Sequence, residues 1–128
     1  MNDLKKNTVF TNGVFDILHP GHIKLLKFCK KISNKLIIGL NSDLSVKQIK
    51  GNDRPYNNIK IRIRNLTKLN LADEILVFNE KTPLNLISRI QPDVLVKGGD
   101  YKKKQIIGQK LSKVIIFPTL NGYSTTKI

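Results

Sequence analysis

The junction between a short apolar run at residues 8–10 and a helical pattern near residue 20 constrains the fold most. The residues that join them, 11–22, read TNGVFDILHPGH. Beyond the junction, apolar residues recur every three to four positions, as on one face of a helix: Ile23, Leu25, Leu26, Phe28, Cys29 and Ile32. A strand, a glycine-bearing loop and a helix start bring backbone N–H groups toward an anion. We therefore expect an anion-binding loop here.

Two histidines lie at this helix start. Pro20 suits the first helical position, because its missing N–H would have no partner there. His19 would then stand at the entrance and His22 in the first turn, so that both imidazoles can face one ligand. A helix cap and an unrelated surface residue are the alternative. The glycine-bearing loop and Gly21 between the histidines favour a ligand site.

Strand and helix patterns alternate along the rest of the chain. Apolar runs at residues 36–40, 75–78, 94–96 and 114–117 predict further strands, and helical patterns lie between them. This alternation predicts one α/β domain over residues 1–128, a Rossmann-like doubly wound parallel five-stranded sheet with helices on both faces. Ligands of such sheets bind at the carboxyl ends of the strands.

Two segments of this pattern carry finer expectations. The polar stretch at residues 41–58 predicts a long loop over the site. Thr82 and Pro83 predict the start of a helix, with the threonine as N-cap and the proline as first residue.

Charge and composition limit the classes of partner. The net charge of +14, from 23 basic and 9 acidic residues, favours anionic partners. Apart from residues 102–104 the lysines are dispersed, and aromatic residues make up only 6% of the chain. Nucleic-acid binding is therefore the lower-ranked alternative to a phosphate-bearing small molecule.

The sequence lacks the features of membrane-spanning and secreted proteins. No apolar run approaches the ~18–20 residues of a membrane span, and no signal-peptide pattern opens the chain. The single cysteine, Cys29, cannot form an internal disulfide and falls on the apolar face of the first helix. We expect a cytoplasmic protein without membrane contact.

Residues 13–16, read GVFD, followed by His19, Pro20, Gly21 and His22 resemble the signature of the cytidylyltransferase-like nucleotidyltransferases. That superfamily joins a nucleoside triphosphate to a phosphorylated small molecule. The resemblance implies that His19, His22, Lys47 and Lys50 are catalytic. It implies nucleotide binding by Asn12, Gly13, Val14, Phe15, His19, Gly21, His22, Lys97, Gly98, Asp100, Ser124, Thr125 and Thr126.

The same resemblance implies a set of substrate-binding residues. These are Asp16, Asn41, Asp43, Lys47, Arg54 and Arg62. Asp16 has the alternative of a turn former. Arg62, which we expect on the polar side of its helix, has the alternative of a surface residue. A loop lysine is otherwise an ordinary solvated charge.

The later loops look most like the adenylyltransferase domain of the bacterial ADP-heptose synthesis enzyme, by VLVKGGDY at residues 94–101 and GYSTTKI at residues 122–128. This implies transfer of AMP from ATP to D-glycero-β-D-manno-heptose 1-phosphate, with release of pyrophosphate. It also implies Mg²⁺ carried by ATP without direct protein ligands, a homodimer and a separate sugar kinase upstream. The chain ends at Ile128, where the family usually continues into a helix. The alternative is a cytidylyltransferase for glycerol 3-phosphate or a similar polyol phosphate.

Overall fold

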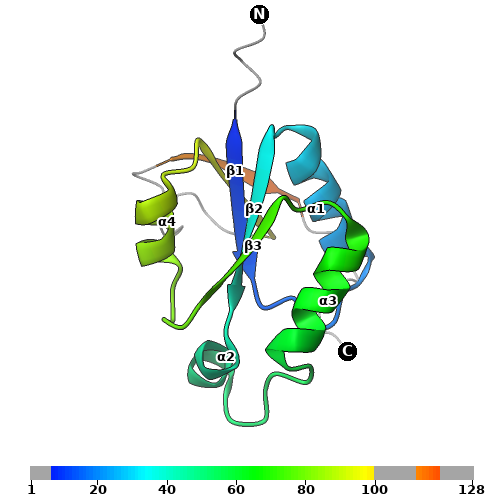
Figure 1. The fold of residues 1–128 in the computed structure, drawn as a ribbon, viewed down its shortest axis with the longest axis vertical. Helices are drawn as coiled ribbons and strands as arrows, with labels where there is room; N and C mark the ends of the chain where they lie inside the picture. Colours follow the sequence, from blue (N-terminus) through cyan, green and yellow to red (C-terminus); the bar gives the residue numbers. More distant parts are fainter. Residues whose placement is uncertain (1–6, 100–111, 119–128) are drawn as a thin grey trace, which may run out of the picture.

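The computed structural model describes residues 7–99 and 112–118. This part of the chain forms one parallel sheet of five strands with four helices (Figure 1). In chain order the elements are β1 (Thr8–Gly13), α1 (Pro20–Lys31), β2 (Lys35–Asn41), α2 (Asp43–Lys50), α3 (Ile59–Leu69), β3 (Glu74–Phe78), α4 (Leu84–Ile90), β4 (Val94–Gly98) and β5 (Lys113–Phe117). The predicted Rossmann-like sheet is confirmed.

The strands lie in the order β3-β2-β1-β4-β5, and every neighbouring pair is parallel. The chain winds outward from β1 through β2 to β3, then crosses back to place β4 on the other side of β1. The direction of winding therefore reverses between β1 and β4, which is where open α/β sheets bind their ligands.

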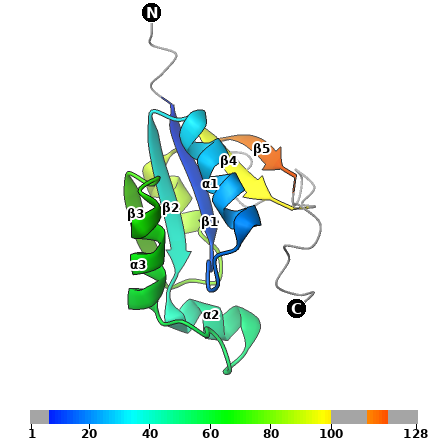
Figure 2. The ribbon, with the colours of Figure 1, turned by 90° about the vertical axis from the view of Figure 1, so that its right-hand side faces the viewer.

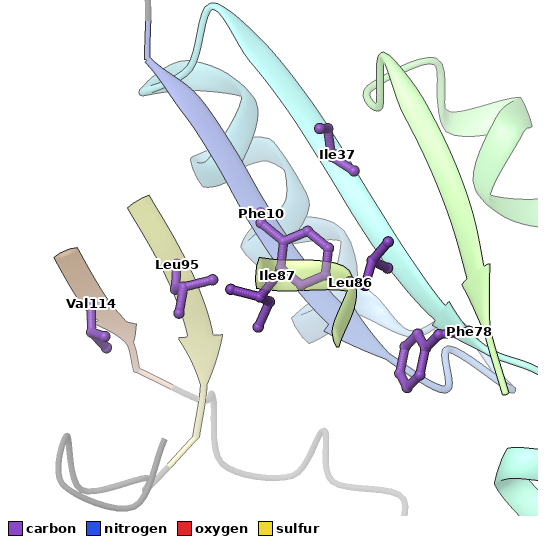
Figure 3. Close-up of a cluster of buried hydrophobic side chains, with 7 residues drawn as sticks. All are labelled: Phe10, Ile37, Phe78, Leu86, Ile87, Leu95 and Val114. Atoms are coloured by element: carbon purple, nitrogen blue, oxygen red, sulfur yellow. The ribbon is translucent and has the colours of Figure 1, made fainter. Parts of the chain in front are cut away.

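Helices cover both faces of the sheet, with α1 and α3 on one side and α4 on the other (Figure 1). Adjacent residues of β1 point to opposite faces: Val9 packs with Leu25 of α1, whereas Phe10 packs with Ile87 of α4. Figure 3 shows this second cluster, in which side chains from all five strands pack with Leu86 and Ile87 of α4. Its buried members are Phe10, Ile37, Phe78, Leu86, Ile87, Leu95 and Val114. Burying a side chain the size of Phe10 stabilises the fold by roughly 2–3 kcal/mol.

Gly39 of β2 lies directly beneath the Phe10 ring. A Cβ atom at this position would stand 2.5 Å from Cζ of Phe10, closer than real Cβ contacts. The register pairs Asn12 with Gly39, so the glycine makes room for the aromatic ring beside the end of β1.

Two expected features differ in the structure. The segment expected to be a loop contains the helix α2, capped by the Ser42 side chain, which accepts a hydrogen bond from the Ser45 N–H at 3.0 Å. Helix α4 begins one residue later than expected: Pro83, not Thr82, occupies the cap, without a side-chain hydrogen bond. The buried residues of α2 are Ser45 and Val46, of which only the valine is apolar. The helix therefore lacks the run of buried apolar residues by which α1 is recognised in the sequence.

The pairing of β1 with β4 is short. Their register covers two residue pairs, Val9 with Val94 and Phe10 with Leu95, whereas β1 and β2 pair over six. Farther along, a side chain joins the strands: the Thr11 hydroxyl donates to the Val96 carbonyl at 2.8 Å and is buried. Within the ranges given above, no helix is long and apolar enough to span a membrane.

Candidate active site

The β1–α1 loop begins with a close aromatic contact. Phe15 is 5% exposed and adopts a left-handed backbone conformation, with φ of 49°. Its ring lies so near Gly13 that a Cβ there would be 3.0 Å from it. Because Gly13 has no side chain, the loop can fold back on the end of β1, and the Phe15 ring can pack against the core.

His19 is the N-cap of α1. Its Nδ1 accepts a hydrogen bond from the Gly21 N–H at 3.2 Å, and Pro20 opens the helix as expected. A nitrogen that accepts carries no proton, so Nε2 is the N–H donor of the neutral ring. The cap therefore fixes both the orientation of His19 and the nitrogen that it can offer to a phosphate.

His22 lies between His19 and Phe15. The two imidazole rings are stacked, with centroids 3.8 Å apart and planes inclined by 23°. The Phe15 ring meets His22 edge-on, with centroids 5.4 Å apart. The structure thus brings the two histidines side by side, with Phe15 against the second of them, and a shared ligand stays a prediction.

Burial and mutual repulsion keep these imidazoles neutral. Desolvation and the nearby His19 lower the pKa of His22 from 6.5 to about 4, against a weaker opposing contact with the Ile17 backbone. Desolvation also lowers the pKa of His19. The buried Nδ1 of His22 has no hydrogen-bond partner of good geometry within the described residues. A phosphate bound beside these rings would supply a compensating negative charge.

Lys97 reaches across the switch point to β1. Its Nζ lies 3.3 Å from Oδ1 and 3.5 Å from the carbonyl oxygen of Asn12. Burial lowers the pKa of Lys97 to about 8, so the ammonium is still mostly charged at neutral pH. The expected nucleotide-binding residues at the ends of β1 and β4, including Gly98, therefore lie on adjacent strands.

A family model described as "Cytidylyltransferase-like" matches residues 10–128 of this sequence. The chain belongs to the cytidylyltransferase-like family. That its paired histidines at the start of α1 and its strand-end lysine form the nucleotidyltransferase site stays a prediction.

Relatives of this cytidylyltransferase-like chain include two proteins named "Bifunctional protein HldE". The one from Nitrobacter winogradskyi is 52% identical over 124 residues, which is 93% of this chain and 25% of that protein. The one from Campylobacter concisus is 49% identical over 125 residues, 97% of this chain and 26% of that protein. The chain thus spans about a quarter of the length of these relatives.

Solved structures agree with the cytidylyltransferase-like fold. The lipopolysaccharide core biosynthesis protein of Thermoplasma volcanium is 25% identical with a TM-score of 0.72, covering 89% of this chain and 96% of that one. Pantoate-β-alanine ligase of Francisella tularensis, at 17% identity and a TM-score of 0.69, covers 96% of this chain and 62% of its own, and shows likeness of fold.

The predicted catalytic lysines lie on α2, below the ends of β1 and β2 in Figure 2. Lys47 and Lys50 are exposed. The Nζ of Lys47 donates to the carbonyl of Arg54 at 3.0 Å, and the Arg54 guanidinium lies 4.4 Å from the centroid of the Tyr56 ring. This edge of the sheet thus carries positive charge beside the β1–α1 loop.

Asp16 holds two loops together. Its carboxylate accepts the N–H groups of Tyr56 and Asn57, each at 2.7 Å, and its carbonyl accepts from the Asn57 amide at 2.7 Å. These contacts are those of a loop-shaping residue. A substrate contact by Asp16 stays a prediction.

Arg62 is not on the polar side of α3, as expected from the sequence, but fully buried. Its guanidinium forms an ion pair with Asp43 at 2.7 Å and donates to the carbonyl of Asn41 at 2.8 Å. Asn41 is also buried, with its amide donating to Ser45 Oγ at 3.0 Å. Carbonyl groups from three segments accept from Arg62, and the pattern of one helix could not reveal them.

Some predicted residues lie outside the described ranges: Asp100, Ser124, Thr125 and Thr126. One residue that sequence reasoning missed is Asn57, whose carbonyl accepts from Nε of Arg62 at 2.9 Å and whose amide donates to Asp16. Its only sequence signal is its place just before the N-cap of α3, Asn58.

Proposed function

We propose that this chain transfers AMP from ATP to a sugar phosphate, D-glycero-β-D-manno-heptose 1-phosphate, and releases pyrophosphate. The observation that carries this proposal is the pair of stacked imidazoles, His19 and His22, at the start of α1 beside the switch point of the sheet. Likeness to a lipopolysaccharide core biosynthesis protein supports a sugar substrate. The HldE relatives support the same direction.

In the proposed reaction, a phosphate oxygen of the sugar phosphate attacks the α-phosphorus of ATP. The bond from that phosphorus to the bridging oxygen breaks, and pyrophosphate leaves with the electron pair. Both reactants are anions, so catalysis consists mainly of holding them in line and stabilising the charge on the leaving oxygens.

The described residues suit this division of work. His19 would donate from Nε2, because its Nδ1 accepts from Gly21. Lys97 would supply a partly buried positive charge on the other side of the switch point. Lys47 and Lys50, exposed on α2, would approach the phosphates from solvent.

We propose that Mg²⁺ enters with ATP, bound to its phosphates, as is usual for this ion. Within the described ranges no three His, Cys, Asp or Glu residues cluster closely enough to hold a metal. The ion would neutralise charge on the triphosphate while the histidines and lysines bind the remaining oxygens. A sugar kinase must supply the phosphorylated sugar, and a homodimer is the assembly that we propose.

A nucleotide-by-acceptor panel tests the function. ATP or CTP is combined with Mg²⁺ and either heptose 1-phosphate or glycerol 3-phosphate, and pyrophosphate release is measured. We expect release only with ATP and the heptose phosphate. Release with CTP and glycerol 3-phosphate would instead make the chain a polyol-phosphate cytidylyltransferase. Silence in every combination, from a folded sample that binds ATP, would overturn the substrate assignment.

A further inference from the structure

Arg62 is a fully buried charge with a single acidic partner. Its side chain is 0% exposed, while that of Asp43, at 2.7 Å, is 37% exposed. Burying a guanidinium is costly unless its N–H groups find acceptors. An ordinary helix–sheet contact would use a leucine here, as Leu66 does one turn later. Something other than packing therefore accounts for the arginine.

The guanidinium joins four places in the chain. It donates to the carbonyl of Val14 in the β1–α1 loop at 3.0 Å and to that of Asn41 at the end of β2 at 2.8 Å. It also donates to the Asn57 carbonyl, ahead of α3, at 2.9 Å. Its fourth partner, Asp43, is the first residue of α2.

Two of these four places carry groups of the proposed reaction. Val14 lies in the β1–α1 loop, which leads to the histidines and is called the histidine loop below, and Asp43 opens α2, the lysine helix, which carries Lys47 and Lys50. The histidine loop and the lysine helix are therefore held by one planar group. A lysine could not replace it, because three donors on one ammonium cannot reach acceptors spread around a guanidinium fork.

Other contacts close the same network. Asp16 of the histidine loop accepts the N–H groups of Tyr56 and Asn57. Lys47 donates to the carbonyl of Arg54, two residues before Tyr56. Residues 54–57 thus contact both the histidine loop and the lysine helix, and Arg62 joins the same two segments through Val14 and Asp43.

We propose that Arg62 is a positioning residue, which fixes the histidine loop and the amino-terminal end of α2 in one arrangement without touching substrate. This proposal rests on the proposed function for its effect on turnover. Its structural content, the coupling of Arg62 to the histidines, does not.

The test compares Arg62→Lys with Arg64→Lys. Arg64 lies on the same helix but is exposed, so its replacement is a matched control. The chain contains only two histidines, and their imidazole signals can be followed by NMR without crowding. We expect Arg62→Lys to shift the His19 and His22 signals and to lower kcat on the order of 10- to 100-fold. Arg64→Lys should change neither.

A second control separates positioning from loss of stability. Ile87→Val alters a buried residue of α4, on the other face of the sheet, and weakens packing away from the histidines and from Arg62. At a temperature where all variants are folded, we expect Ile87→Val to keep wild-type kcat and histidine signals. If Arg62→Lys does not fold, Asp43→Asn removes the negative charge beside the guanidinium while keeping a side-chain oxygen, and should shift the histidine signals in the same direction.

Three results would overturn the inference. One is unchanged histidine signals in Arg62→Lys with kcat within about threefold of wild type. Another is a rise in KM for the sugar phosphate alone, which would indicate direct substrate contact. The third is an equal loss of kcat in Ile87→Val. If wild-type protein transfers no nucleotide, the proposed function fails, and the NMR comparison still decides whether Arg62 positions the histidines.

Discussion

The imidazole rings of His19 and His22 lie stacked with their centroids 3.8 Å apart. Two positive charges at this distance repel strongly, and the lowered pKa of His22 includes this effect. A triphosphate bound against the pair would offset the repulsion. The two imidazoles are therefore mostly neutral at pH 7 without a ligand, and a bound anion would favour their protonation.

Replacement of His22 by alanine tests its catalytic role. Loss of a preorganised donor to the transition state should lower kcat on the order of 100- to 1000-fold, while the fold remains intact. Pyrophosphate release at saturating ATP gives kcat, and circular dichroism gives the folded fraction. Lys27→Ala, an exposed change on the same helix, is the control. Activity within a few-fold of wild type would show that His22 has been assigned the wrong role.

Acid should destabilise the protein through His22. The pKa of His22 is 6.5 in the unfolded chain and about 4 in the folded protein, so its imidazole is uncharged in both states well above pH 6.5. As pH falls from 6.5 toward 4, His22 binds a proton in the unfolded chain but not in the folded protein, so the free energy of unfolding decreases. Because the ring is only partly buried, we expect a loss of about 1–2 kcal/mol between pH 7.5 and pH 5.

Urea unfolding at the two pH values measures this loss. His22→Gln removes the titrating group, so the pH-dependent loss in this variant should be smaller by the amount due to His22. The ordinary carboxylates titrate below this range and affect both proteins alike. An equal loss in wild type and variant would show that the pKa of His22 is not lowered.

ATP affinity should fall above pH 8 because Lys97 loses its charge there. Its pKa is about 8 in the absence of ligand, and only the ammonium attracts phosphate. We expect Kd to rise by up to about tenfold per pH unit between pH 8 and pH 9.5. Titration calorimetry with Lys97→Arg, which stays charged throughout, should show a flat profile. A flat profile in wild type would remove Lys97 from the nucleotide site.

Gly39→Ala should lower the free energy of unfolding by about 1–3 kcal/mol, because the new methyl group overlaps the buried Phe10 ring. Chemical denaturation measures the change. Adding Phe10→Leu removes the ring atom that the methyl meets, so the double variant should lose less than the sum of the single losses. Strictly additive losses would place the strain elsewhere.

The sequence predicts best those elements whose formation depends on residues close together in the chain. Pro20 and the histidines specify the start of α1, and the apolar runs specify the strands. Helix α2 is hidden because Ser45 and Val46 are its buried residues, while Leu44 and Ile49 point outward. A helix of eight residues with only two of them buried is too short to be recognised from its apolar spacing alone.

Arg62 shows the other limit. Within α3 it reads as one more cation among the lysines and arginines of the polar side. Its burial depends on carbonyl groups of Val14, Asn41 and Asn57, which only the folded chain brings together. The spacing of apolar residues predicts which side of a helix is buried. Whether a charged side chain can also be buried depends on hydrogen-bond acceptors from distant segments of the chain.

Because β1 and β4 pair over only two residues, few backbone hydrogen bonds join the two halves of the sheet. The backbones pair at Val9 and Phe10, and beyond them the Thr11 hydroxyl and the Lys97 ammonium form the contacts between the two strands. A nucleotide bound across β1 and β4 would contact both halves. Its binding energy would then strengthen the whole sheet, and ligand-induced thermal stabilisation would report on the union of the two halves rather than on one loop.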